Sequence, residues 1–383
     1  MSSEWRTVRV GDLGRIVTGK TPRTTIKENF GGKIPFLTPS DDMSAKYVRK
    51  TKRTLSEQGV AEVAGKVLPA NSIAVSCIGS NLGKVTITTT ETVTNQQINS
   101  IIPFESYYDT DFVYYAIKIL GERLNFLSKT STAVPIINKT QFSNETIRVP
   151  PLPIQKAISG TLACLDAKIE INNRITANLE QQAQAIFKNW FVDFEPFKDG
   201  EFIDSPLGLI PKGWKVEKLE DLVNIKYGKD HRSLPDGDIP VYGSGGLIRY
   251  ISEAIYTSES VLIPRKGTLN NVMLVNHPFW SVDTMFYTEI NKPNFAKFLF
   301  QLLKRKDLAS MNVGSAVPSM TVALLNQIRF VLPPDEILEQ FERVTNPFYL
   351  KIENNRRQNQ ILAALRDTLL PKLMSGEIEV PVV

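Results

Sequence analysis

The chain has little of the chemistry on which most enzymes depend. Its 383 residues include only two histidines, His231 and His277, and two cysteines, Cys77 and Cys164. Two histidines exclude a histidine-rich metal site, and two cysteines in apolar surroundings do not form a disulfide framework. Since no spacing is typical of a nucleophile and its base, we expect no catalytic residues, no bound metal and no cofactor.

Long apolar runs and export signals are missing as well. No hydrophobic stretch approaches the roughly 20 residues needed to span a bilayer, and the N-terminus MSSEWRTVRV lacks the apolar core of a signal peptide. We therefore expect a cytoplasmic protein with reduced thiols and no membrane association. The composition, 42% hydrophobic and 22% charged, is that of a globular protein, and the length suggests two or three domains.

What the chain does contain is a long amphipathic segment, residues 158–190. Seam positions recur there at alternating spacings of four and three, the pattern of a coiled coil: Ile158, Leu162, Leu165, Ile169, Asn172, Thr176, Leu179, Ala183, Ile186 and Trp190. A helix of this length is about 50 Å long and needs a partner for its narrow stripe. Residues 335–375 carry a second, less regular stripe, and Pro347 is expected to kink or break that helix.

The chain also repeats itself. Five residues recur 209 positions later: Trp5, Asp12, Leu13, Gly19 and Lys20 return as Trp214, Asp221, Leu222, Gly228 and Lys229. The repeat extends into the helical segments, where Lys168-Ile169-Glu170 recurs as Lys351-Ile352-Glu353. These matches predict two copies of one unit, each a mostly-β domain followed by a long helix.

The expected fold class is α+β, with two mostly-β globular domains joined by two long helices in an antiparallel coiled coil, as a pseudo-twofold internal repeat. The first domain is expected at 1–153, the central helix at 154–195, the second domain at 196–333 (including a linker at 196–213), the C-terminal helix at 334–376 and a tail at 377–383. Asn172 and Asn355 fall near the helix midpoints, where a buried polar residue can fix register. A position facing a wet gap is the alternative.

Residues 14–21 match the phosphate-binding pattern GxxxxGK[ST] letter for letter. A P-loop follows a buried parallel strand, and residues 8–12 do not read as one. The second copy keeps Gly228 and Lys229 but has Val223 and Asp230 at two required positions. We therefore interpret the motif as a repeated Gly-Lys turn and not as an ATP site.

Positive charge is concentrated in the globular regions. Residues 1–150 hold 19 Lys and Arg against 13 Asp and Glu, residues 196–334 hold 16 against 14, and both helical segments are neutral. Basic loop residues, such as those at 46–53, can neutralise phosphates, and neighbouring polar side chains can read base edges; a solvated face is the alternative. The candidate DNA-binding residues are Lys20, Thr21, Arg23, Lys50, Arg53, Ser80, Asn81, Lys84, Asn95, Gln96, Lys229, Arg232, Ser244, Arg265, Lys266 and Asn270.

With these features, the chain resembles the specificity subunits of type I restriction–modification enzymes. The resemblance covers essentially the whole chain and rests on the tandem of domain and helix, on the proline-rich entry into each helix, and on the pattern Leu-x-x-Ile-x-x-Gly-Lys-Thr-Pro at residues 13–22. The second copy departs from this pattern, because Gly228-Lys229 is followed by Asp230-His231.

The resemblance implies that each domain reads one half of a split, asymmetric site on double-stranded DNA, and that the helices set the spacer between the halves. It also implies two modification subunits, which carry S-adenosylmethionine and methylate adenine, docked on the helices, with restriction subunits joining through them. A heptad inserted between Thr176 and Ala183, with a matching one in the second helix, is then expected to lengthen the spacer alone. The alternatives are a protein-binding scaffold, a P-loop nucleotide hydrolase, and an orphan subunit that self-associates through its helices.

Overall fold

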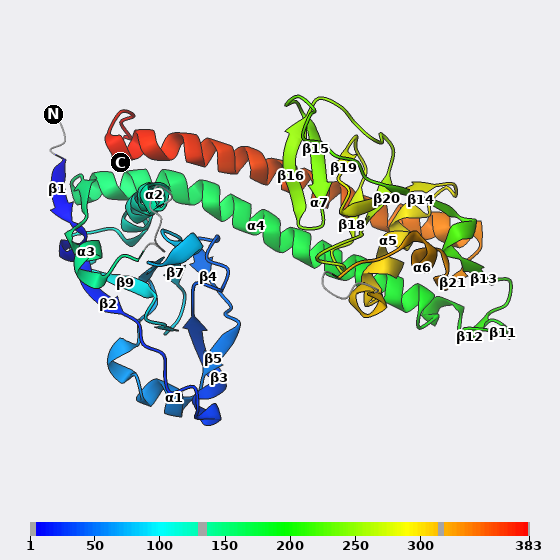
Figure 1. Cartoon of the computed structure of the whole chain (residues 1–383), viewed down its shortest axis with the longest axis horizontal. Coiled ribbons are helices and arrows are strands. Elements are labelled where there is room, and N and C mark those ends of the chain that lie inside the picture. Colours follow the sequence, from blue (N-terminus) through cyan, green and yellow to red (C-terminus); the bar gives the residue numbers. More distant parts are fainter. Residues whose placement is uncertain (1–4, 129–135, 313–317, 382–383) are drawn as a thin grey trace. The chain divides into compact units, whose positions relative to one another are not determined.

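The computed structural model describes residues 5–128, 136–312 and 318–381. They fall into two compact units, the first made of Met1–Asn172 with Arg357–Val383 and the second of Asn173–Arg356. Two long helices, α4 (Leu152–Phe191) and α7 (Asp335–Ser375), each contribute a segment to both units. Each unit therefore combines one globular domain with paired segments of α4 and α7 (Figure 1).

The globular part of the first unit is built on three sheets. A five-stranded sheet has the order β2-β9-β6-β7-β4, a three-stranded sheet has the order β5-β3-β8, and β1 pairs with β10. The strands are β1 Arg6–Arg9, β2 Gly14–Thr18, β3 Phe30–Leu37, β4 Tyr47–Val48, β5 Arg53–Leu55, β6 Ile73–Ser76, β7 Val85–Thr88, β8 Val93–Thr94, β9 Ile98–Pro103 and β10 Thr146–Val149. The helices are α1 Glu57–Ala61, α2 Thr110–Ser128 and α3 Lys139–Asn144.

The second unit repeats this topology except for β4, which has no counterpart among its described strands. Its sheets have the orders β14-β20-β17-β18, β16-β15-β19 and β13-β21, with an added hairpin β11-β12. The strands are β11 Phe202–Ser205, β12 Gly208–Pro211, β13 Lys215–Lys218, β14 Val223–Tyr227, β15 Ile239–Gly243, β16 Gly246–Ile251, β17 Ser260–Pro264, β18 Met273–Val275, β19 Trp280–Ser281, β20 Met285–Ile290 and β21 Arg329–Leu332. The helices are α5 Ala296–Arg305 and α6 Val322–Asn326. The predicted internal repeat is confirmed.

The residues that recur in sequence hold the same turns in both copies. Asp12 accepts a hydrogen bond from the backbone N–H of Arg9 at 3.3 Å, and Asp221 accepts one from Lys218 at 3.0 Å. Each aspartate thereby closes the 3₁₀ turn that leads from the first strand of its domain into the second. In both copies the short strand β8 or β19 runs parallel to β3 or β15, whereas the large sheets pair antiparallel except at β4–β7.

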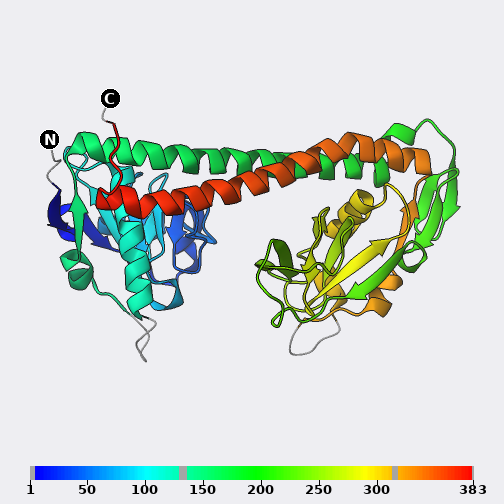
Figure 2. The same ribbon diagram turned by 90° about the horizontal axis from the view of Figure 1, so that it is seen from above.

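Within each unit the segments of α4 and α7 run side by side in opposite directions (Figure 2). In the first unit, Asp166 of α4 pairs with Arg366 of α7 at 2.7 Å. In the second, Glu180 pairs with Arg356 at 3.0 Å. The contacts follow the expected antiparallel seam, since the partner's residue number falls from 366 to 356 as that of α4 rises.

The two helices depart from prediction at Pro347 and at their ends. Of the two alternatives expected at Pro347, a kink or a break, the break is wrong, because α7 continues through this residue from Asp335 to Ser375. Phe341, Thr345 and Tyr349 around the proline are all buried, so packing offsets the lost backbone hydrogen bond. Helix α4 ends at Phe191, short of residue 195, because Phe194 has a φ of +54° and Pro196 follows.

The apolar core of each unit joins its domain to the helices. In the first unit, Ile158 and Leu162 of α4 and Leu370 of α7 pack with the α2 residue Tyr115. The second unit uses aromatic rings: Phe187 and Phe191 of α4 contact Phe298 of α5 and Phe341 of α7 at centroid distances of 4.9–6.0 Å. Burial of each such ring stabilises the junction by about 2–3 kcal/mol. None of the helices described is long and apolar enough to cross a membrane.

Candidate DNA interface and its junction with the helices

At the Gly-Lys turn of each domain, two backbone segments cross in close contact. In the first domain the N–H of Gly19 donates to Ile98 O at 3.1 Å and that of Lys20 to Thr94 O at 2.9 Å. In the second, the N–H of Gly228 donates to Met285 O at 3.1 Å and that of Lys229 to Ser281 O at 2.8 Å. A Cβ atom on Gly19 would lie 2.3 Å from Thr94 O, and one on Gly228 would lie 2.1 Å from Val282 O. Only glycine fits there.

This geometry does not fit a P-loop. The strand before Gly19 is β2, which pairs antiparallel with β9. The segment after it leads into a three-residue 3₁₀ helix, Lys27–Asn29, in place of the long helix whose N-terminus would hold a phosphate. The repeated glycine is explained by the close approach of the two backbones, and the lysine beside it is exposed in both copies.

Four of the candidate residues of the first domain come together at this crossing. Thr21 Oγ1 donates to Gln96 Oε1 at 2.8 Å, and Lys20 is bonded through its backbone to Thr94, next to Asn95. Asn95 is braced by Gln97, whose Oε1 accepts from Asn95 Nδ2 at 3.1 Å. Lys20 and Gln96 are exposed. Gln97 belongs to the same run of polar side chains suited to base edges.

The other candidates of the first domain have different surroundings. Ser80 and Lys84 line a hollow against α2, and Arg53 stacks over Phe30 with its Cζ atom 4.1 Å from the ring centroid. Arg23 forms an ion pair with Glu62 at 2.7 Å. The hydrogen bonds from Arg23 and Asn29 outweigh partial burial and lower the pKa of Glu62. Lys50 is exposed in the segment between β4 and β5.

In the second domain the candidates surround the equivalent crossing. Lys229 and Lys266 are exposed, and Arg232 forms an exposed ion pair with Asp230 at 3.2 Å. Hydrogen bonds from Arg232 lower the pKa of Asp230. Arg265 Nη1 donates to the backbone oxygen of Asp283 at 3.0 Å. Asp283, which the sequence did not single out, is exposed at the position that corresponds to Gln96.

Three asparagine side chains in these loops brace the fold. Asn81 Nδ2 donates to Pro39 O at 2.7 Å, and its counterpart Asn271 donates to Ser244 O at 2.8 Å. Asn270 is engaged at both ends, donating to Asp307 at 3.2 Å and accepting from the N–H of Ala309 at 3.0 Å. These side chains have fewer free groups for base edges than their positions in polar loops suggest.

The two seam asparagines are buried. Asn172, at 0% exposure, donates from Nδ2 to Gln358 Oε1 at 2.8 Å and to Asn359 Oδ1 at 2.9 Å. Asn355, at 1% exposure, donates to Thr176 Oγ1 at 3.4 Å. Burial excludes the wet-gap alternative. Each amide forms cross-helix hydrogen bonds within its own unit, which is the geometry expected of a residue that sets register.

The sequence placed Lys46 in a basic loop suited to phosphate contact, with a solvated face as the alternative, but the side chain is 8% exposed. Its Nζ pairs with Asp111 of α2 at 2.9 Å and donates to the Tyr115 hydroxyl at 3.3 Å. Tyr115 in turn donates to Asp166 of α4 at 2.5 Å, and Asp166 also pairs with Arg366 of α7. A continuous polar chain thus joins the first domain to both helices.

Ionisation within this junction follows from burial. Burial, and then the charge and hydrogen bond of Asp166, raise the pKa of Tyr115 well above its ordinary value. Burial, and then the charge of Asp111, raise the pKa of Tyr47 to about 12. Burial opposes the Arg366 cation, but hydrogen bonding to Asp166 outweighs it and raises the arginine's pKa. At neutral pH the junction holds neutral phenols between paired charges.

The second unit uses one buried lysine for the same purpose. Lys297 of α5 is 3% exposed, and its Nζ lies 2.9 Å from Glu259 Oε1 and 2.6 Å from Glu342 Oε1 of α7. Beside it, Gln301 Nε2 donates to the hydroxyl of Tyr349 at 2.6 Å. The two junctions are built from different residues. In both of them a buried lysine, Lys46 or Lys297, takes part in the polar contacts that join the domain to a long helix.

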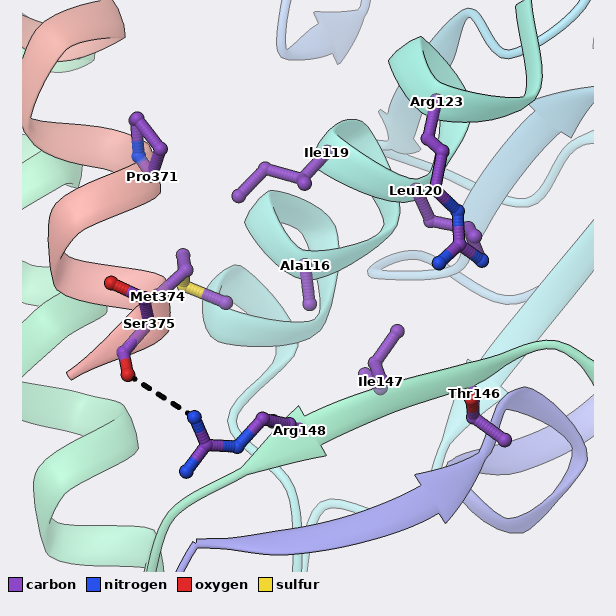
Figure 3. A pocket seen from close by; sticks show the side chains of 10 residues that line it. All are labelled: Ala116, Ile119, Leu120, Arg123, Thr146, Ile147, Arg148, Pro371, Met374 and Ser375. Atoms are coloured by element: carbon purple, nitrogen blue, oxygen red, sulfur yellow. Dashed lines mark hydrogen bonds between the residues drawn. The ribbon is translucent and has the colours of Figure 1, made fainter. Parts of the chain in front are cut away.

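A cavity of about 300 Å³ lies between α2, β10 and the last turn of α7 (Figure 3). Its two arginines are engaged: Arg148 Nη1 donates to Ser375 O at 3.4 Å, and Arg123 pairs with Glu145 at 2.6 Å. The lining contains no carboxylate, histidine or cysteine: Ala116, Ile119, Leu120, Arg123, Thr146, Ile147, Arg148, Pro371, Met374 and Ser375. It offers no acid–base pair for catalysis. Across residues 5–128, 136–312 and 318–381, no group of three or more His, Cys, Asp and Glu could hold a metal ion.

Comparison with known proteins agrees with this geometry. The family model described as the type I restriction modification DNA specificity domain matches residues 2–181 and 211–363. The chain is 29% identical to the type I restriction enzyme MjaIX specificity subunit of Methanocaldococcus jannaschii, over 98% of this chain and 94% of that protein. It is 35% identical to the HindI specificity subunit of Haemophilus influenzae, over 45% of this chain and 38% of that protein.

A solved structure has the same fold. The S subunit of a type I restriction–modification system from M. genitalium aligns with a TM-score of 0.63, covering 97% of this chain and 96% of that one. Identity in this alignment is 19%, so the likeness concerns the fold alone.

Proposed function

The chain belongs to the family of type I restriction–modification DNA specificity subunits, which recognise DNA without an active site of their own, and from this premise we propose that its two domains read two unlike half-sites. Residues 1–153 are the first target recognition domain, and 196–333, with the linker 196–213, are the second. The helices at 154–195 and 334–376 set the unread spacer. They also dock two modification subunits, through which restriction subunits join the complex.

One observation carries the proposal: equivalent positions of the two domains present different side chains. Backbone hydrogen bonds from Lys20 to Thr94 and from Lys229 to Ser281 align the two crossings. Two residues further on, the first domain presents the amide of Gln96 and the second the carboxylate of Asp283. An amide pairs best with adenine in the major groove, whereas a carboxylate accepts from cytosine. Two domains that share one backbone arrangement but present different side chains are suited to an asymmetric target.

The charges support separate roles for the domains and the helices. Both domains carry a positive excess, whereas the segments 158–190 and 335–375 are each balanced. Phosphate contacts require positive charge, and protein docking does not. Exposed Lys20, Lys50, Lys84, Lys229 and Lys266 act as phosphate contacts in this proposal, whereas Thr21, Asn95, Gln96, Ser80 and Ser244 face base edges.

DNA binding by the complex of this chain with its modification subunits tests the proposal. We expect log K to fall linearly with log salt concentration on any duplex, because phosphate contacts release counterions. From a random pool the complex should also select a sequence of two separated half-sites. A protein-binding scaffold would retain no duplex DNA at any salt concentration, and that result would overturn the proposal.

A pair of exposed lysines sharpens this test. Lys20→Ala removes a charge at the crossing, and Lys139→Ala removes one from α3, also exposed. We expect the first substitution to lower the magnitude of the salt slope by about 1 and the second to leave it unchanged. Equal slopes for both variants would contradict the placement of DNA at the crossing.

A further inference from the structure

Arg265 of the second domain is held from two sides before any ligand arrives. Its Cζ atom lies 5.3 Å from the ring centroid of Tyr227, and its Nη1 donates to Asp283 O at 3.0 Å. Stacking and one hydrogen bond restrict the plane of the guanidinium. Arginine carries five N–H donors, so most of the fork remains for another partner.

The supports of Arg265 are themselves fixed. The N–H of Arg265 donates to Thr284 O at 2.8 Å, and its carbonyl accepts from the N–H of Met320 at 2.8 Å. Tyr227 lies opposite Phe286 across β14 and β20, with the rings 5.0 Å apart and edge to face. Phe286 is fully buried, whereas Tyr227 is 53% exposed. A buried ring thus supports an exposed ring, and the exposed ring supports the arginine.

Other basic side chains of this domain are engaged differently. Arg232 is paired with Asp230 at 3.2 Å, and Lys226 with Glu289 at 3.5 Å. Arg249 donates from Nη2 to Leu234 O. By contrast, the Arg265 guanidinium contacts one neutral carbonyl and one ring face. Its charge is therefore not cancelled by those contacts, although its orientation is set.

We propose that Arg265 reads a guanine in the half-site of the second domain, with Tyr227 as its positioning residue. A fork of two N–H donors matches O6 and N7 of guanine in the major groove, and a guanidinium whose rotamers are already restricted loses less entropy on binding. The inference deepens the proposed function and rests on it.

The first domain lacks an equivalent of this arginine. Cys77 occupies the matching position, because its N–H donates to Gln97 O at 2.9 Å as that of Arg265 donates to Thr284 O. Cys77 is 5% exposed, and Asn99 Nδ2 donates to its sulfur at 3.2 Å. A buried thiol cannot reach a base. The predicted guanine contact therefore belongs to one half-site only.

The test compares methylation patterns produced by the complete complex containing wild-type chain, Arg265→Ala or the neighbouring Lys266→Ala. The wild-type target should contain a guanine in one half-site at which Arg265→Ala lowers discrimination by roughly 5- to 150-fold, the range for one bidentate contact. The other half-site should be unchanged. Lys266→Ala, which removes an exposed charge, should weaken all sequences alike.

The positioning role of Tyr227 is tested by comparing a substitution that removes the ring with one that keeps it. Tyr227→Leu removes the ring face beneath the guanidinium and should lower discrimination at the same guanine, whereas Tyr227→Phe keeps the face and should retain it. Thermal unfolding of each variant is measured alongside. A structural role alone would lower the unfolding temperature and the rate of methylation at all targets without relaxing one base pair.

Three results overturn the assignment of Arg265. The first is a wild-type target without guanine in either strand of the second half-site. The second is uniform weakening by Arg265→Ala with a salt slope smaller by about 1, which identifies a phosphate contact. The third is an unchanged pattern for Arg265→Ala. Absence of any bipartite target in the wild type would instead contradict the proposed function itself.

Discussion

A Cβ atom on Gly19 would lie 2.3 Å from the carbonyl oxygen of Thr94. Gly19 and Thr94 both belong to the backbone crossing that recurs at Gly228, so the repeated glycine reflects the close packing of two backbone segments. The crossing, and not a nucleotide, accounts for the Gly-Lys pair in both halves of the chain.

Gly19→Ala should therefore destabilise the first domain. A methyl group forced against backbone atoms costs about 1–3 kcal/mol, because neither strand can move freely. The measurement is the unfolding temperature by calorimetry. Gly65→Ala is the matched control, since its Cβ meets nothing within 4 Å. Equal unfolding temperatures for the two variants would contradict the close approach.

Asn172→Ala should weaken the helix pair of the first unit. The substitution leaves Gln358 and Asn359 without the amide that joins them, at a cost of about 1–3 kcal/mol. The exposed Lys168→Ala, on the same helix, should cost less than about 0.5 kcal/mol, as surface substitutions usually do. Urea titration followed by helical circular dichroism compares the two variants, and a larger loss for Lys168→Ala would refute the assignment of the seam.

Lys297→Met should destabilise the second unit by on the order of 3 kcal/mol, because it leaves two carboxylates near a buried site without their cation. The side chains of Glu342 and Glu259 keep 20% and 33% of their exposure, which reduces the loss. Adding Glu342→Gln should recover part of it in a double-mutant cycle. The exposed Lys304→Met is the control; a loss no larger than that of the control would argue against a role for this junction.

Alkaline pH should loosen the junction of the first unit. The folded-state pKa of Tyr115 lies above the unfolded value of about 10. Above pH 10 the folded state therefore binds more protons than the unfolded state, and the free energy of unfolding falls as pH rises. Tyr115→Phe removes this titration and should make the fall between about pH 10 and 12 shallower, by up to ~1.4 kcal/mol per pH unit.

The control for this measurement is Tyr107→Phe, since Tyr107 is 70% exposed. Its stability should follow the wild-type pH dependence. If the Tyr115→Phe and wild-type curves run parallel above pH 10, burial of the phenol against Asp166 does not contribute to stability.

The repeat and the paired helices could be predicted from the sequence because both are patterns of spacing. A fixed offset places Trp5, Asp12 and Gly19 opposite Trp214, Asp221 and Gly228, and the seam is visible from its alternating steps. The sequence could not exclude a break at Pro347, because local propensity disfavours proline within a helix, whereas the buried Phe341 and Tyr349 hold the helix together through contacts distant in sequence.

The site was less predictable because the partners of polar side chains are distant in sequence. Lys46 belongs to a basic run, yet it is neutralised by Asp111, sixty-five positions on. Asn270 resembles a base-reading residue until its bonds to Asp307 and Ala309 are known. Arg265 gave no more signal than Lys266 beside it, because its support comes from Tyr227 on another strand.

The helical spacer is tested by an insertion, and the structure indicates where to place it. The segment Thr176–Ala183 carries Glu180, which pairs with Arg356 inside the second unit at 3.0 Å. A heptad is therefore better inserted between Asn172 and Asn173, with a matching one between Arg356 and Arg357, where the two units divide. Neither domain is altered by these insertions.

The measurement is the methylated sequence produced by the complete complex with the doubly inserted chain. Seven residues add about 10 Å of helix, which corresponds to about three base pairs at ~34 Å per ten-base-pair turn. We predict the same two half-sites as for the wild type, separated by a spacer longer by about that amount. Altered half-sites, or an unchanged spacer between intact ones, would contradict the account of two reading domains on a helical spacer.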